Sequence, residues 1–198
     1  MNKVQIIKDS LKEAGEYYTK LHSQSGLKCP EGCGKCCFNP NVYCRPSELL
    51  PMAFEYIRLG EAENMLEKIN ALLESSVQDQ TCLILNIKDE SRFLGNCSMY
   101  EFRPLLCRSF GVFLRKNKDE KREFSLCREF KELYPDDVKV LGNQIEQFNE
   151  SPTVDKISYS FYNSNADLIY ETEMQINKAL KWALERALFL HSLQEKST

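Results

Sequence analysis

Apolar residues recur every three to four positions along several stretches of the chain, which is the spacing of one face of an α-helix. Near the start these residues are Val4, Ile7, Leu11, Ala14, Tyr18 and Leu21. They predict an amphipathic helix over residues 3–22. A second periodic stretch begins at Ser47, a favourable N-cap, and runs to about Ser75, with Gly60 as a point of division. A third periodic stretch predicts a long helix over 166–191.

The middle of the chain has a different pattern. Two short runs of mixed apolar content, TCLILNI (81–87) and RFLGNCSMY (92–100), flank the polar sequence KDES. Strand-length runs on either side of a polar turn predict a β-hairpin. Pro104 suits the first turn of a helix, so a short helix is expected from there toward Phe110.

The remaining stretches complete the secondary-structure prediction. Helices are expected over 119–134 and 136–148, and the polar residues 149–165 are the expected linker. The sequence therefore predicts a mainly α fold with a small β-hairpin.

Composition and charge narrow the class of protein. Of the 198 residues, 42% are hydrophobic, which is enough for a buried core. The net charge of −3, with both signs mixed along the chain, disfavours a nucleic-acid binder. Neither a signal-peptide pattern nor an apolar run of about 18 residues is recognisable, so a cytoplasmic protein outside the membrane is expected.

Nine cysteines change this picture most. An odd number in a reducing compartment points away from a disulfide framework and toward metal or redox chemistry. Four of them form the cluster Cys29-x3-Cys33-x2-Cys36-Cys37, with Gly32 and Gly34 interspersed. Such a loop can wrap thiolates around zinc or iron, since glycine tolerates the backbone conformations required.

Adjacent cysteines add a constraint to this cluster. Neighbouring side chains are expected to project in different directions, so Cys36 and Cys37 could share one ion only with strain. Either one of the two is a bystander, or the site holds more than one metal.

A second constellation reads Cys97-x2-Tyr100-x2-Arg103-Pro104-x2-Cys107-Arg108. It offers two more ligands at a junction between a strand and a helix. The cations Arg103 and Arg108 are candidates to offset the negative charge of a thiolate site, and Tyr100 joins them as a candidate contact to the bound group.

These motifs together resemble a known family. CPEGCGKCC, TCLIL and GNCSMYEFRPLLCRSFG occur in the order found in the YkgJ-like bacterial proteins named after the CxxCxxCC pattern, which are described as zinc- or iron-chelating. One extra residue separates the first two cysteines. The resemblance implies the metal ligands Cys29, Cys33, Cys36, Cys37, Cys82, Cys97 and Cys107. Cys127 is a plausible further ligand. Cys44 looks least like one, and the eight cysteines that remain would suffice for two four-thiolate sites.

The predicted domain organisation follows from these assignments. Residues 1–148 are expected to form a cysteine-cluster domain with an N-terminal helix, and 166–198 a helix packed on the same domain. The cysteine-rich loop is expected to be stabilised by metal and to lie among the helices.

Three functions remain open at this point. The first is a metal-binding protein that holds zinc or iron, the iron also as an iron–sulfur cluster. The second is an iron–sulfur oxidoreductase or a protein-modifying enzyme similar to the lysine methylases. The third is a thiol redox sensor. Hydrolase and nucleotide motifs are not found. The only histidines are His22, a conceivable extra ligand, and His191. The expected partner is a metal ion; the end helices could also bind a protein.

Overall fold

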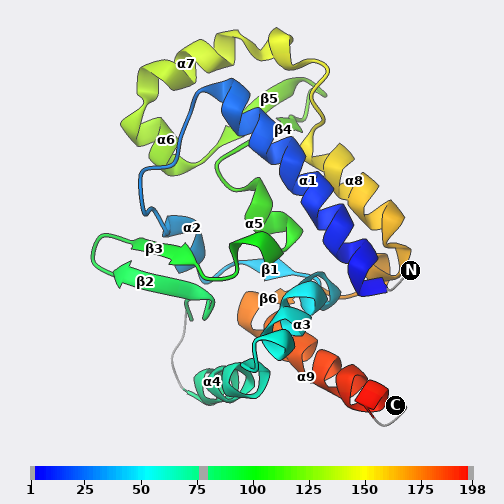
Figure 1. The fold of residues 1–198 in the computed structure, drawn as a ribbon. Coiled ribbons are helices and arrows are strands. Elements are labelled where there is room, and N and C mark those ends of the chain that lie inside the picture. Colours follow the sequence, from blue (N-terminus) through cyan, green and yellow to red (C-terminus); the bar gives the residue numbers. More distant parts are fainter. Residues whose placement is uncertain (1–2, 76–79, 196–198) are drawn as a thin grey trace.

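The computed structural model describes residues 3–75 and 80–195 (Figure 1). The fold is mainly helical with small antiparallel strand pairs, as predicted. The expected domain limits at 1 and 198 fall on residues 1–2 and 196–198, outside the described residues, so the division into domains stays a prediction. Within the described ranges, no helix is long and apolar enough to cross a membrane.

The described residues form helices, 3-10 turns and short strands. The helices are α1 (Lys3–Ser25), α2 (Lys35–Phe38), α3 (Leu50–Arg58), α4 (Ala62–Glu74), α5 (Leu105–Ser109), α6 (Arg128–Leu133), α7 (Pro135–Asn143), α8 (Val154–Ser164) and α9 (Ile176–Glu195). The 3-10 turns are η1 (Pro46–Leu49), η2 (Tyr100–Phe102), η3 (Ile145–Phe148) and η4 (Ala166–Tyr170). The strands are β1 (Tyr43–Cys44), β2 (Leu85–Asp89), β3 (Leu94–Cys97), β4 (Val112–Lys116), β5 (Arg122–Leu126) and β6 (Met174–Gln175).

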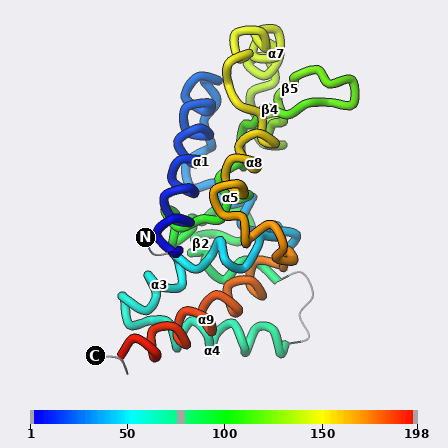
Figure 2. The backbone as a smooth tube through the Cα atoms, turned by 90° about the vertical axis from the view of Figure 1, so that its right-hand side faces the viewer, coloured from blue at the N-terminus to red at the C-terminus, as the bar shows by residue number. Residues whose placement is uncertain are grey.

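Helices α3, α4 and α9 pack together as one layer at one end of the molecule (Figure 2). Leu180, Ala183 and Leu184 of α9 are fully buried there. Helix α1 lies along α8 and also contacts α5 (Figure 1). The apolar stripes of these helices therefore meet one another and form the main core.

The N-terminal helices form largely where the periodicity predicts them. Helix α1 covers the expected range and continues to Ser25. Gly60, with a φ of 71°, lies between α3 and α4, as expected for a residue that tolerates positive φ. Ser47 does not cap the following helix; it lies inside turn η1, and Pro51 opens the first turn of α3.

The helix predicted over 119–134 is wrong in its first part. Strands β4 and β5 form a hairpin there, in which Val112 pairs with Leu126, and α6 follows. The reason is turn chemistry: the Asn117 side chain accepts hydrogen bonds from the main-chain N–H groups of Asp119 and Lys121, which stabilises the hairpin turn.

The stretch 149–165 holds a helix where a linker was expected. Ile157 and Phe161 of α8 lie one helical turn apart and are buried in the main core, while most of the helix is polar and faces solvent. The last helix begins later than predicted, at Ile176. Residues 166–170 form turn η4 instead, and Met174 pairs with Cys44 in the β1–β6 ladder.

The predicted hairpin over 81–100 is confirmed. Strands β2 and β3 pair antiparallel, with Leu85 opposite Cys97. The chain then passes through η2 into α5, where Pro104 occupies the N-cap position. These elements place Cys97 and Cys107 near the cysteines of residues 29–37.

Candidate metal centre

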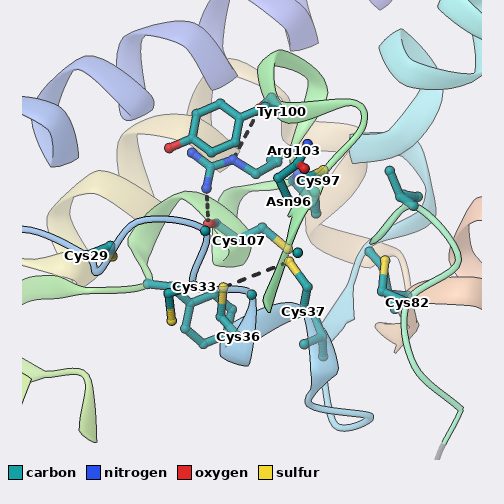
Figure 3. A pocket seen from close by; sticks show the side chains of 18 of the residues that line it. Cys29, Cys33, Cys36, Cys37, Cys82, Asn96, Cys97, Tyr100, Arg103 and Cys107 are labelled. Atoms are coloured by element: carbon teal, nitrogen blue, oxygen red, sulfur yellow. Dashed lines mark hydrogen bonds between the residues drawn. The ribbon is translucent and has the colours of Figure 1, made fainter. Parts of the chain in front are cut away.

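Seven cysteines from four separate stretches of the chain line one cavity of about 370 Å³ (Figure 3). They are Cys29, Cys33, Cys36, Cys37, Cys82, Cys97 and Cys107. The first four come from the loop before and within α2, and the others from the start of the hairpin, the end of β3 and α5. The cavity therefore gathers cysteines up to 78 positions apart in sequence.

Two glycines allow the cysteine loop to lie directly on the hairpin. Gly34 N–H donates to the Phe93 carbonyl at 2.9 Å, and Gly95 N–H donates to the Gly32 carbonyl at 2.8 Å. A Cβ atom on Gly95 would lie 2.7 Å from the Asn86 carbonyl oxygen, and one on Gly34 would lie 3.2 Å from the Gly95 main chain. The absence of a side chain at Gly34 permits this contact between loop and hairpin, whereas the absence of one at Gly95 permits the close pairing of β3 with β2.

The adjacent pair Cys36 and Cys37 lies in the single turn of α2. Their sulfur atoms are 3.9 Å apart (Figure 3). Tetrahedral zinc with Zn–S bonds of about 2.3 Å separates its sulfur ligands by about 3.8 Å. The expectation that the two side chains diverge is therefore wrong: the helical backbone leaves both sulfurs at a spacing that suits one ion.

Cys107 approaches the cavity from α5, whose N-terminus is held by a buried carboxylate. Glu48 of η1 is 1% exposed, and its Oε2 accepts a hydrogen bond from Leu105 N–H at 2.8 Å. Its Oε1 accepts from Tyr162 Oη at 3.1 Å and from Arg45 N–H at 3.2 Å. Because Pro104 offers no side-chain cap, Glu48 supplies the acceptor that the helix start requires.

Arg103 and Tyr100 lie together at the cavity wall (Figure 3). The Arg103 guanidinium stacks 3.5 Å from the Tyr100 ring centroid, and its Nη1 donates to the Cys107 carbonyl at 3.1 Å. Burial raises the pKa values of Cys97 and Cys107, and the positive charge of Arg103 opposes this rise; at Cys36 it adds to the lowering of the pKa that the hydrogen bond from Cys37 causes. Arg103 therefore lies beside the cysteines whose charge it is predicted to offset.

Arg108 lies outside the cavity lining and acts on the main chain instead. Its Nε donates to the Arg103 carbonyl at 2.8 Å, and its Nη2 donates to the Glu101 carbonyl. Its Nη1 occupies the space that a side chain at Gly15 of α1 would fill. Arg108 thus stabilises the turn that contains Arg103.

Three further candidates also lie outside the cavity lining. Cys127, at the N-cap of α6, packs with the smaller apolar cluster, but its charge influences the pKa of Cys29. Cys44 is 3% exposed in the main core. His22 Nε2 accepts a hydrogen bond from Val112 N–H at 3.1 Å, so this ring holds the start of β4.

Comparison with known families now decides the relationship. A family model described as "CxxCxxCC: Putative zinc- or iron-chelating domain" matches residues 28–132, just over half of the chain. The chain belongs to this family. No curated protein and no solved structure matches it. The matched range contains all seven cavity cysteines and Cys127, and the protein is a metal-binding one on this evidence.

Burial is the main influence on the pKa values of most of the cavity cysteines. It raises the pKa of Cys29 to about 11 and that of Cys82 to about 12, and it is also the main cause of the raised pKa values of Cys97 and Cys107. Between Cys36 and Cys37, one thiol donates to the other, which lowers the pKa of Cys36 and raises that of Cys37. Most of these sulfurs thus favour the protonated form, and a thiophilic cation would have to displace their protons.

The donor set fits such a cation. Clustered cysteine sulfurs with a nearby guanidinium are the chemistry of zinc, iron and iron–sulfur sites. Within the described ranges, no three cysteine, histidine, aspartate or glutamate side chains are already placed so that they could hold a metal ion. If these thiols bind an ion, they must lose their protons as they do so, because thiolates without a bound cation repel one another.

Two residues at the edge of the site were missed in the sequence. One is Glu48, which follows the predicted N-cap Ser47 and is 1% exposed. The other is Asn177, a lone amide in the apolar stripe of the last helix, which is fully buried. A polar residue at a core position was the available signal, since such groups are seldom buried without a partner.

Proposed function

We propose that the chain holds zinc or iron through the thiolates of the cysteines that line the cavity. The observation that carries this proposal is the convergence of seven cysteine side chains, from distant parts of the chain, on a single cavity beside Arg103. Membership of the family supports chelation in general. The ligand set and the number of ions are the parts proposed here.

The electrostatic neighbours of each sulfur support two groups of ligands. Cys37 and Cys107 are both influenced by Cys82 and Cys97, which defines an inner group. Cys29 is influenced by Cys33 and Cys127, which defines an outer group. Cys36 influences every cysteine of the inner group and also Cys29, so it belongs to the inner group and adjoins the outer one.

This division favours a centre with more than one metal atom. The seven cavity cysteines, or eight with Cys127, exceed the four that a single zinc ion takes. Both zinc and iron accept thiolate-only sites, so metal supply and geometry decide between them. Zinc would give the centre a structural or chelating role, whereas an iron–sulfur cluster would supply one-electron chemistry.

A second candidate function is catalysis at an iron–sulfur centre. The observation that favours it is the apolar part of the cavity wall, formed by the buried residues Val42, Met52, Ile84 and Ile176. Structural sites are closed, whereas this apolar wall adjoins space that a small substrate could fill. Titration of the reduced iron protein with imidazole, followed by electron paramagnetic resonance, tests it. A changed signal supports an accessible iron, and an unchanged signal argues against one.

Alanine substitution at two cysteines tests the main proposal. Cys36→Ala should lower the metal-to-chain ratio and the melting temperature, because it removes a sulfur of the inner group that adjoins the outer one. Cys44→Ala is the matched control: it removes a buried thiol outside the cavity lining and should leave the metal content unchanged. Full metal content in Cys36→Ala would contradict the proposed ligand set.

A further inference from the structure

Asn177 makes two hydrogen bonds to the main chain on either side of Cys82. The side chain is 0% exposed, at the second residue of α9. Its Nδ2 donates to the Thr81 carbonyl at 3.0 Å, and its Oδ1 accepts from Leu83 N–H at 3.0 Å. One amide therefore holds the peptide groups that flank a cavity cysteine.

The segment around Cys82 has little regular structure of its own. Residues 80–84 precede β2 and belong to no helix or strand, and their local hydrogen bond runs from Leu85 N–H to the Cys82 carbonyl at 3.0 Å. Ordering such a segment costs conformational entropy that side-chain anchors must offset. The two bonds from Asn177 tie this segment to the start of α9.

Asn177 is itself held in place by its neighbours. Its main-chain N–H donates to Gln175 Oε1 at 2.8 Å, and Ile176 N–H donates to the Val42 carbonyl at 2.8 Å. Strand β6 pairs with β1, which directly continues the segment after Cys36 and Cys37 (Figure 1). The start of α9 is thus joined both to the first cysteine loop and to the Cys82 segment.

We propose that Asn177 is a positioning residue of the metal centre, and that it sets the location of Cys82 relative to Cys37 and Cys97. The inference rests on the proposed function. Asn177 lies outside residues 28–132, so the centre of this chain extends beyond the region that defines its family. Helix α9 then contributes a positioning residue to the metal centre in addition to its buried residues in the core.

Asn177→Ala and Asn165→Ala form a matched pair of variants. Asn165 is also a buried amide, 6% exposed, but its Nδ2 donates to the Phe161 carbonyl within its own helical segment at 2.8 Å. Loss of a residue that orients a metal ligand typically weakens metal affinity about 10- to 100-fold. Competition with a chromophoric chelator, with zinc added as the probe, should show such a loss for Asn177→Ala and an unchanged affinity for Asn165→Ala.

Asn177→Asp keeps the side-chain volume and the acceptor for Leu83 N–H but loses the donor to Thr81, so it provides a second variant if the alanine variant folds poorly. The proposal predicts a weaker zinc affinity for this variant also, measured on the fraction that is folded. Equal affinity of the folded wild type and both Asn177 variants would overturn it and leave Asn177 as a packing residue.

A double-mutant cycle separates action through Cys82 from a general loss of order. If Asn177 acts through Cys82, adding Asn177→Ala to Cys82→Ser should change zinc affinity little, whereas adding it to Cys29→Ser should lower affinity by the full factor. An equal loss in both backgrounds would overturn the proposed route. If Cys82→Ser alone left zinc binding intact, the ligand set would fail first, and the two failures are thereby distinguished.

Discussion

The helical layer of α3, α4 and α9 and the cysteine-bearing segments around the cavity are stabilised in different ways. In the layer, long elements bury continuous apolar stripes, and Met52, Ile69 and Leu180 have no exposed surface. Around the cavity, α2 has four residues and none of them is buried, and α5 has five. The layer can persist through apolar burial alone, whereas the cavity region depends on glycine contacts, on polar anchors and, as proposed, on metal.

Removal of the metal should produce the largest difference between the two regions. Structural zinc contributes an apparent free energy of about 10–16 kcal/mol in small metal-folded domains. Treatment with a strong chelator should therefore expose the amides of 29–37 and 94–107 to hydrogen exchange while α9 stays protected. Hydrogen exchange followed by mass spectrometry checks this. Equal protection of both regions with and without chelator would contradict the claim that the cavity region depends on metal and the helical layer does not.

A cavity made within the helical layer should have the reverse effect. Leu180→Ala removes a fully buried side chain of α9, and such changes cost about 2–5 kcal/mol of unfolding free energy. The metal-to-chain ratio of the folded protein should stay at the wild-type value. Urea unfolding and metal analysis on the same samples check both parts. Loss of metal in this variant would mean that the two regions are not separable.

A methyl group inside the β2–β3 hairpin, at the residue whose N–H bonds to the cysteine loop, should have a smaller effect on stability but also weaken metal binding. Gly95→Ala places a Cβ 2.7 Å from the Asn86 carbonyl oxygen, and overpacking of this kind costs about 1–3 kcal/mol. Gly142→Ala is its control, because a Cβ there meets nothing within 4 Å and the site is helical. Thermal melting and chelator competition should rank wild type and Gly142→Ala together, above Gly95→Ala.

The smallest expected effect concerns the buried carboxylate beside α5. Burial raises the pKa of Glu48 in the folded protein above its ordinary value. The folded state then binds more protons than the unfolded state just above pH 4.5, so the contribution of Glu48 to stability falls as the pH rises through this window. A tenfold difference in proton affinity corresponds to about 1.4 kcal/mol.

Glu48→Gln should remove this pH dependence. The groups that face Glu48 are Arg45, Tyr162 and Cys44, and the variant leaves all three in place. Urea unfolding of both proteins at several pH values between about 4 and 7 measures the difference in stability. A difference that is independent of pH would show that Glu48 titrates alike in the folded and unfolded chains.

Much of the fold could be predicted because apolar periodicity is a local signal. Helix α1, the break at Gly60 and the β2–β3 hairpin follow from spacing and turn residues. The β4–β5 hairpin could not be predicted in this way, since its turn depends on the Asn117 side chain. Helix α8 was missed because its polar composition hides two core residues a single turn apart.

The candidate site, like the fold, could be predicted only in part from the sequence. The family resemblance implied the seven cysteines that line the cavity, but it did not reveal that α2 leaves Cys36 and Cys37 with sulfurs 3.9 Å apart. Asn177 and Glu48 act over separations of 94 and 57 residues. Such contacts exist only after the chain has folded, so local pattern carries little trace of them.

The most direct measurement is the metal and acid-labile sulfide content of tag-free protein purified without oxygen. The account predicts at least one zinc or iron atom per chain, with sulfide present only if the metal is iron in a cluster. Metal-free protein that is folded, together with rapid chemical labelling of all nine cysteines, would contradict it.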